Sequence, residues 1–439
     1  MERKYHLDKK IMWKFNSVLN WLKFSYSLIG IILVWMSVSS DYSAFHIFSF
    51  FFVTTVLINI PSNILSPLNI LFAYYGLWFF LSPLLGSGYS YELLNSYEYE
   101  VSIALVYTNF ITCLYGIKFG IFVANFIKVC PNSHILYKAS LRRKILALYF
   151  FSSLMIFMII NSSGGFNVWL ENPGDAFLNR AGSGVYVILS HFSSIILSAL
   201  VGLYAYKYKS SFMWLTFFSW LLLTSPVHGS KFQISLLFLL SILPWLRKGK
   251  TFSFTGFLLV LSFLMIFLLG MFFRGADISN VDKIFNLFNY FSTLHNLAIS
   301  VSDFKPGSEF TFWLPFNKFL TPFGLDSSVE YYDMNHYLTD IYYPQAWAIR
   351  ATEQWPVETD LYLNFYFFAG LPFIFIYMLA IGLLYKMSLI TSSFGVSVVS
   401  LLVTIFMISH LRGSLYNHTD FYMVPYMVIV LFAFKKYRI

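Results

Sequence analysis

Four basic residues near the ends of hydrophobic runs have the chemistry to bind an anion. Arg180 lies in a glycine-containing segment before one run, and Lys231 follows a His-Gly-Ser sequence. Arg274 and Arg412 each follow a run directly and precede a glycine. A guanidinium group binds phosphate oxygens in a two-pronged fork, whereas lysine acts as a point charge. If the runs form a helix bundle, we expect these four side chains to converge on one diphosphate.

Three further side chains are candidates for a general base. Glu358 and Asp360 lie at the start of a hydrophobic run, where a membrane helix would place them near the lipid headgroups. His336 is the third candidate, because an imidazole titrates near neutral pH. A base at any of these positions could accept the proton of an attacking hydroxyl group.

Each of these residues also has a simpler interpretation. A basic side chain at a helix end can extend to the lipid headgroups without binding a substrate. Glu358 and Asp360 could be solvated loop acids, and His336 could be an ordinary surface residue. A different chemistry is suggested by Glu98 and Glu100, which resemble the paired acids that hold a metal ion in lipid-dependent glycosyltransferases.

The composition is typical of a membrane protein. Of the 439 residues, 58% are hydrophobic and 11% are charged, whereas soluble domains carry about 25% charged residues. We therefore expect residues 1–439 to form a single, all-α membrane domain that crosses the bilayer many times.

Twelve membrane spans are predicted from runs of mostly apolar residues, since a helix of roughly 20 such residues crosses a bilayer. They cover residues 24–40, 44–60, 69–85, 101–126, 145–161, 186–206, 211–227, 232–246, 253–272, 361–385, 391–410 and 419–434. The lysines and arginines concentrate in alternate connections, and such residues favour the cytoplasmic side. We therefore expect both termini in the cytoplasm. The net charge of +9 is then a signal for insertion beside anionic lipid, and it does not indicate a nucleic-acid partner.

The same orientation places two long connections outside the cytoplasm. The connection 162–185 contains several glycines, and the connection 273–360 holds 11 of the 20 acidic residues of the chain together with many aromatic side chains. Within the longer one, apolar residues recur every three or four positions from Ile284 to Val301, which predicts an amphipathic helix at the membrane interface. Its aromatic residues could stack on sugar rings or pack as a small cap.

These features together resemble the O-antigen polymerases, the Wzy-type enzymes that join oligosaccharide repeat units of bacterial surface polysaccharides. The resemblance rests on the many spans with cytoplasmic ends, and on the two external connections with an arginine in each, Arg180 and Arg274. The segments 228–231 and 358–370 also look like the family. Some members carry a glycine eleven positions after each loop arginine, and here those positions hold His191 and Phe285.

The resemblance implies a function in the bacterial inner membrane. The enzyme would transfer a growing glycan from undecaprenyl pyrophosphate to the non-reducing sugar of another lipid-linked repeat unit. Arg180, Arg274, Lys231 and Arg412 would bind the leaving pyrophosphate, and Glu358, Asp360 or His336 would act as the base. The implied mechanism needs no cofactor and no metal ion, because the cations neutralise the leaving group. A chain-length regulator is a candidate protein partner, besides the lipid bilayer itself.

Three rival functions share parts of this pattern. An O-antigen ligase has the same topology and moves the glycan to the lipid A core. A flippase or transporter of lipid-linked sugars would carry its substrate across the membrane, and transporters tend to place ionisable residues at mid-membrane. A metal-dependent glycosyltransferase would use Glu98 and Glu100.

Overall fold

The computed structural model shows an all-helical protein. It describes residues 2–38, 40, 42–85, 96–127, 138–171, 176, 184–228, 231–272, 291, 293–320, 331–348 and 352–439. Within these residues there is no β-strand, and two isolated bridges pair single residues. The expected all-α membrane architecture is confirmed at this level.

Long helices make up most of the described chain. In the first half they are α1 (Glu2–Ser37), α2 (Ala44–Asn59), α5 (Tyr97–Ala124) and α6 (Lys138–Ser162). Between α2 and α5, helix α3 (Pro67–Tyr75) continues as the π-helical η1 (Gly76–Leu81) and as α4 (Ser82–Leu85). The short helix α7 (Gly165–Glu171) follows α6. The middle of the chain forms α9 (Gly184–Tyr208), α10 (Ser211–His228), α11 (Lys231–Leu246) and α12 (Phe254–Phe272). The last three are α19 (Leu371–Ile390), α20 (Phe394–Leu411) and α21 (Asp420–Ala433).

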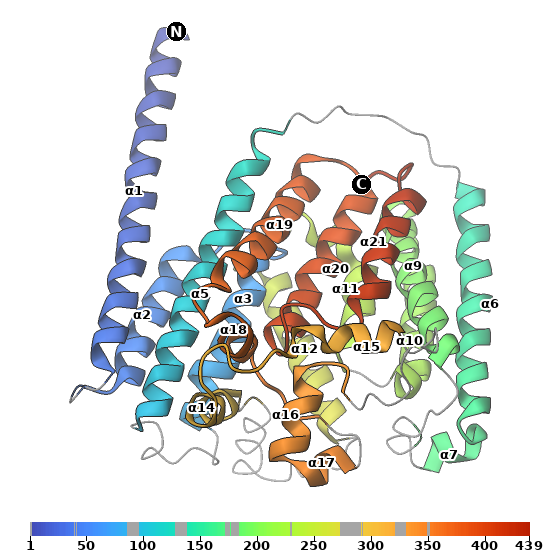
Figure 1. Cartoon of the computed structure of the whole chain (residues 1–439). Helices are drawn as coiled ribbons and strands as arrows, with labels where there is room; N and C mark the ends of the chain where they lie inside the picture. Colours follow the sequence, from blue (N-terminus) through green and yellow to red (C-terminus); the bar gives the residue numbers. More distant parts are fainter. Residues whose placement is uncertain are drawn as a thin grey trace.

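Short helices lie between α12 and α19. They are α14 (Thr293–Asp303), η4 (Thr311–Trp313), α15 (Leu314–Leu320), α16 (Met334–Tyr342), α17 (Pro344–Ala348) and α18 (Val357–Phe365). We call the group from α14 to α17 the cap. In Figure 1 the cap lies at one end of the bundle, and both chain termini lie at the other end, which we call the termini end.

Each of the twelve expected spans overlaps a helix of the structure. Seven helices in the described residues are long and apolar enough to cross a bilayer: 18–37, 67–85, 97–124, 139–162, 184–208, 371–390 and 394–411. Four of the other expected spans coincide with shorter apolar helices, 44–59, 233–246, 254–266 and 420–433, and the fifth coincides with α10. The structure therefore shows a multi-pass membrane protein. The number of spans, twelve, and the cytoplasmic location of both termini stay predictions.

The tenth expected span, 361–385, differs from the structure. The chain forms α18 first, and then Tyr366 and Phe367 adopt positive φ angles of 52° and 61°. A left-handed residue ends an α-helix, because its carbonyl and amide no longer continue the ladder. The new helix α19 begins beyond Gly370, with proline in its first turn. As a result α18 is a separate element that turns back into the bundle.

Two hydrophobic cores hold the bundle together. The first contains buried side chains of α2, α3, α5, α14, α18 and α19, and the second contains those of α6, α9, α10, α11 and α21. Helix α20 belongs to both, because Met407 and Leu411 near its end lie in the first core and Val398 and Leu402 lie in the second. Figure 1 shows α20 between the two groups of helices.

The described part of the expected interfacial helix is α14, and it packs on protein. Leu294, Leu297 and Ala298 are buried in the first core, and α14 contacts α5. Its apolar face is therefore covered by the bundle instead of lying in the membrane interface. Residues 284–290 of the expected helix fall outside the described residues.

Helices α5 and α19 pack closely, because glycines let their backbones touch. Gly116 and Gly120 of α5 face α19, and Gly382 of α19 faces the backbone of Ile117. A Cβ atom on Gly116 would lie 2.9 Å from the carbonyl oxygen of Phe375. Two small residues four apart let membrane helices approach closely, and close packing is the main attraction between helices in lipid.

We expect Gly120→Ala to destabilise the bundle. The added Cβ would overlap the backbone carbonyl of Leu379, and overpacking of this kind costs about 1–3 kcal/mol. Gly76→Ala is the matched control, because the nearest atom to its Cβ would be 3.9 Å away on Phe52. Thermal unfolding of the purified proteins in detergent should show a lower midpoint for Gly120→Ala alone. Equal midpoints for the two variants would contradict this packing.

Candidate functional site

Glu358 is buried inside the bundle. It lies in the first turn of α18 and is 0% exposed. Its Oε1 accepts hydrogen bonds from the Tyr75 hydroxyl and from Asn109 Nδ2, each at 2.8 Å. Its Oε2 is buried and has no hydrogen-bond partner among the described residues. Burial raises the pKa of Glu358 to about 7, although the two hydrogen bonds oppose the shift.

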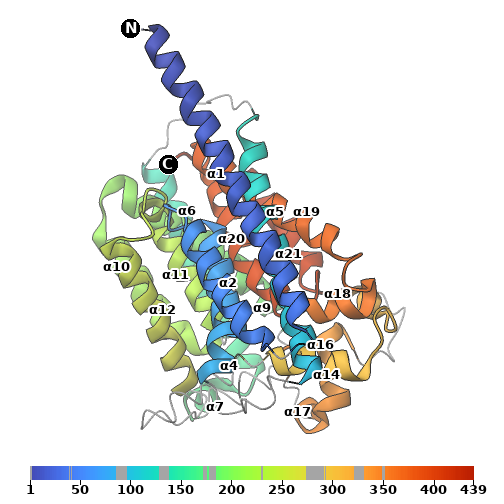
Figure 2. The ribbon, with the colours of Figure 1, turned by 90° about the vertical axis from the view of Figure 1, so that its left-hand side faces the viewer.

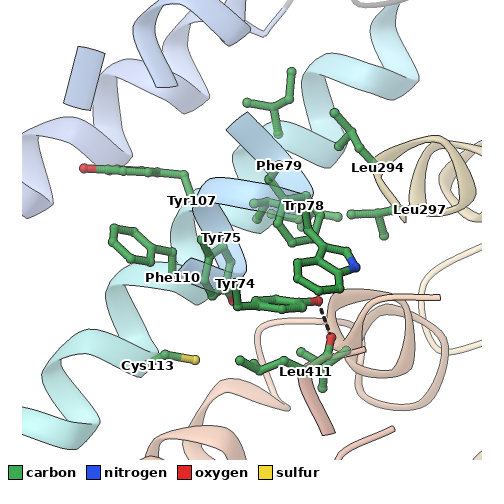
Figure 3. Close-up of a cluster of buried hydrophobic side chains, with 14 of the residues drawn as sticks. Tyr74, Tyr75, Trp78, Phe79, Tyr107, Phe110, Cys113, Leu294, Leu297 and Leu411 are labelled. Carbon is green, nitrogen blue, oxygen red and sulfur yellow. Dashed lines mark hydrogen bonds between the residues drawn. The ribbon is translucent and has the colours of Figure 1, made fainter. Parts of the chain in front are cut away.

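The partners of Glu358 show how deep it lies. Tyr75 is near the middle of the apolar helix 67–85, and Asn109 is near the middle of the helix 97–124. Figure 3 shows Tyr75 among the buried aromatic side chains of this region. The expectation of a solvated acid or a base at the headgroup level is therefore wrong for Glu358, because α18 carries it back between α3 and α5.

Asp360 connects α18 to two other segments. Its Oδ2 accepts a hydrogen bond of 2.9 Å from the backbone N–H of Leu415, and its Oδ1 accepts one of 2.8 Å from Asn364. Asn364 in turn donates to Thr311 and accepts from the backbone N–H of Phe312. Burial raises the pKa of Asp360 to about 7, against the effect of these donors. Both oxygens are engaged, so Asp360 positions the loop 411–418 and the start of η4.

Glu358 and Asp360 do not act as a carboxylate pair. Residues two positions apart in a helix point to different faces, and the two side chains have no common partner among the contacts above. Glu358 faces α3 and α5, whereas Asp360 faces the loop 411–418. The two candidate bases therefore lie in separate environments, both closed to solvent.

His336 lies in a cluster of ionisable side chains on the cap. Asp333 begins α16 by accepting a hydrogen bond of 2.9 Å from the backbone N–H of His336. Its carboxylate is also 3.6 Å from Nδ1 of His336 and 3.6 Å from Nδ1 of His418. Burial alone would raise the pKa of Asp333, but the contacts with the two histidines outweigh it and lower this pKa below its usual value.

Arg412 is linked to α16 through its backbone. Its Nε donates to Gln354 Oε1 at 2.8 Å, and its guanidinium carbon is 5.6 Å from the centre of the Trp78 ring. Its backbone carbonyl accepts a hydrogen bond of 3.3 Å from Asn335, the residue before His336. Figure 3 shows Trp78 and Leu411, which precedes Arg412, in the same region. The backbone of Arg412 thus contacts the start of α16, whereas its guanidinium group contacts Gln354 and Trp78.

The other expected cations are only partly described. Arg180 and Arg274 fall outside the described residues. Lys231 is the first residue of α11, and its side chain is not described. The convergence of all four cations on one anion therefore stays a prediction.

The metal-binding alternative receives no further ligand from the described residues. Glu98 and Glu100 lie in the first turn of α5, and Glu100 is buried. The described part of the chain contains no group of three or more His, Cys, Asp or Glu side chains that could hold a metal ion.

Several residues of these sites escaped the sequence analysis. Asn109 could have been noticed as an amide in the middle of an apolar span, where polar side chains need partners. His418 was not a candidate, because a single histidine in a short connection has no distinguishing pattern. Nothing in the sequence distinguishes Gln354 and Tyr75 from other polar residues, because their roles depend on contacts with residues far away along the chain.

Comparison with known proteins gives no assignment. No family model, curated protein or solved structure matches the chain. The resemblance to O-antigen polymerases therefore stays a prediction from the sequence.

We expect the stability of the protein to fall as the pH rises from about 4.5 to about 7. Folding raises the pKa of Glu358 from 4.5 to about 7, so in this range the folded state binds more protons than the unfolded state, which makes unfolding easier as protons are removed. Asp360 adds to the effect in the same direction. Glu358→Gln should reduce the slope, because a neutral amide replaces the titrating group.

The unfolding midpoint in detergent, measured from pH 4.5 to 8, tests this expectation. Glu353→Gln is the control, because Glu353 belongs to the same connection but is exposed. The pH dependence of that variant should match the wild-type protein. A Glu358→Gln variant with an unchanged pH dependence would show that Glu358 does not titrate in this range.

Proposed function

We propose that this protein is a polymerase of undecaprenyl-pyrophosphate-linked oligosaccharide repeat units, acting at the periplasmic face of the bacterial inner membrane. In this proposal the cap end of the bundle faces the periplasm. The proposal rests on the sequence resemblance and on one structural observation: the backbone of Arg412 contacts Asn335, the residue before His336, and Asp333 lies close to both His336 and His418.

Glycan transfer requires a cation for the leaving group and a base for the acceptor, and this end of the bundle contains a candidate for each. Arg412 carries a fixed positive charge suited to the leaving diphosphate. His336 and His418 supply imidazoles, and the carboxylate of Asp333 lies 3.6 Å from a ring nitrogen of each. Nδ1 of His336 accepts a hydrogen bond of 3.3 Å from the backbone N–H of Tyr332, so this nitrogen carries no proton in the neutral ring and can accept one. The nearby negative charge of Asp333 would stabilise the imidazolium that then forms. His336 is therefore our preferred base, whereas Glu358 and Asp360 serve mainly to hold α18 in place.

Aromatic side chains beside His336 favour a sugar as the acceptor. The ring of Trp347 lies 5.2 Å from the ring of His336, and Tyr331 lies 5.9 Å from Trp347. Aromatic faces provide apolar surfaces on which a sugar ring can pack. The Tyr331 hydroxyl also donates to Asp340, and the Tyr337 hydroxyl donates to Glu309, so acidic acceptors for sugar hydroxyl groups lie in the same part of the cap.

A second candidate function is the flipping of lipid-linked sugars. It is favoured by Glu358, which places an ionisable group deep among apolar helices, where such groups often mark a transport pathway. In that case the protonation of Glu358 would accompany passage of the substrate. The ligase alternative shares the cap chemistry and differs only in the acceptor.

We expect purified protein in liposomes to convert undecaprenyl-pyrophosphate-linked repeat units into a ladder of longer glycans. Arg412→Gln should lower the yield by about 100-fold, because loss of one charged donor to a developing oxyanion has an effect of this size. Arg412→Lys should keep part of the activity. Lys305→Gln is the control, because Lys305 is an exposed cation near the cap.

The products separate the candidate functions. Transfer to added lipid A core without a ladder would indicate a ligase. Movement of the lipid-linked sugar across the liposome, lost in Glu358→Gln and without new glycosidic bonds, would indicate a flippase. A full ladder from Arg412→Gln would remove Arg412 from the proposed diphosphate site.

We also expect His336→Gln and His418→Gln to differ in the polymerase assay. His336→Gln should nearly abolish the ladder at every pH, since the proposed base is lost. His418→Gln should keep activity but shift its pH profile, because Asp333 would then be paired with His336 alone. Identical profiles for wild-type protein and both variants would contradict the assigned roles.

A further inference from the structure

Three hydrogen-bonded side chains connect the last three long helices, and the proposed mechanism uses none of them. The Tyr377 hydroxyl of α19 lies 2.8 Å from Nδ1 of His410, near the end of α20. Nε2 of the same ring lies 2.9 Å from Oδ2 of Asp420, the first residue of α21. His410 is 8% exposed. Figure 2 shows α20 and α21 side by side, and both α19 and α21 contact α20. The imidazole therefore joins three helices inside the bundle.

The proton positions in this network follow from its acceptors. A carboxylate oxygen only accepts hydrogen bonds, and Oδ2 of Asp420 also accepts one of 2.9 Å from the backbone N–H of Asn417. The imidazole nitrogen that faces Asp420 therefore carries a proton and donates it. In the neutral ring the other nitrogen has no proton and accepts from the Tyr377 hydroxyl. One tautomer of His410 thus satisfies both contacts, which fixes the orientation of the ring.

Asp420 closes the base of the loop 411–418. This loop begins directly after His410 and ends two residues before Asp420. The same carboxylate oxygen contacts the ring of His410 and the backbone of Asn417, so it ties the start of the loop to its end. Asn417 Oδ1 also accepts a hydrogen bond of 3.0 Å from the backbone N–H of Thr419, a turn that asparagine favours. The position of this closed base depends on where the His410 ring holds Asp420.

The closed base carries both loop residues of the proposed site. Arg412 lies two positions after His410, and His418 lies one position after Asn417. The hydrogen bond of Asp360 holds the middle of the loop, and the His410 contact holds its ends. A misplacement of about 1 Å can lower the rate of a reaction about 100-fold when it moves groups that must face a substrate. The orientation of one buried ring therefore bears on two candidate residues.

We propose that His410 is a positioning residue, whose imidazole holds Asp420 and thereby sets the places of Arg412 and His418. His410 acts through Asp420 and takes no direct part in the transfer. Its importance for glycan transfer rests on the proposed function, whereas its effect on the loop does not. The simpler alternative is that the three side chains only stabilise the bundle. Loss of the ring would then lower the unfolding midpoint without a specific effect on the loop 411–418.

Hydrogen–deuterium exchange of the full-length protein in detergent tests the positioning without an activity assay. Tyr377→Phe removes only the hydroxyl, and we expect the backbone amides of 411–418 to exchange about fivefold faster, the effect of losing one hydrogen bond. His410→Leu removes both contacts of the ring and should raise the exchange rate further. His410→Gln should match Tyr377→Phe, because the amide N–H of glutamine can still donate to Asp420.

Tyr426→Phe is the matched control. It also removes one tyrosine hydroxyl, which donates a hydrogen bond of 2.7 Å to the backbone of Phe192, and it lies on α21 as Asp420 does. Exchange in the loop should stay at the wild-type rate in this variant. In the polymerase assay His410→Leu should lower kcat by about tenfold or more, His410→Gln should restore most of it, and Tyr426→Phe should keep the wild-type value.

Unchanged exchange of the loop in Tyr377→Phe and His410→Leu would overturn the proposal, and Tyr377→Phe decides if His410→Leu does not fold. An equal rise in Tyr426→Phe would indicate a general loss of stability and would overturn it as well. Faster exchange with unchanged transfer would remove the positioning role, because the loop would then move without an effect on the reaction. A wild-type protein without polymerase activity would contradict the proposed function, and the exchange rates would still decide whether His410 holds the loop.

Discussion

The arrangement of the cap end depends on the burial of α18 between α3 and α5. An acidic side chain in an apolar bundle is unfavourable unless it is hydrogen-bonded or neutral. Here the Tyr75 hydroxyl and the Asn109 amide both donate to one oxygen of Glu358. Asp360, on another face of the same helix, then fixes the loop 411–418 through the backbone of Leu415. That loop carries Arg412 and His418, so the position of the candidate site follows from how α18 is held.

The close contact of α5 with α19 is the second requirement. The glycines at 116, 120 and 382 remove the side chains that would separate these helices, and α5 contributes Asn109 to the Glu358 contact. Helix α19 begins directly after the turn that follows α18. This helix pair therefore carries both a hydrogen-bond donor to Glu358 and the chain segment that directly follows α18.

The positions of the long helices could be predicted from the sequence, because each apolar run is long and has no competing pattern. The break between α18 and α19 could not, because Tyr366 and Phe367 are not residues that usually take positive φ angles. The burial of Glu358 was also missed, since an acidic residue in a long polar connection is usually solvated. Its partners are 249 and 283 residues away along the chain. The cluster of Asp333, His336 and His418 also could not be predicted, because it joins two segments that are close together only in the folded bundle.

The hydrogen bond between Asn109 and Tyr75 has a consequence for the order of biogenesis. Both residues leave the ribosome long before Glu358, which follows Asn109 by 249 residues. The Asn109 amide donates to the Tyr75 hydroxyl at 3.1 Å, so the two polar groups can satisfy each other in the nascent bundle while no acid is present. Translation of α18 then completes a pair that is already assembled. The carboxyl of Glu358 would lose its hydration only as α18 docks, at a place where both of its hydrogen-bond donors are already in position.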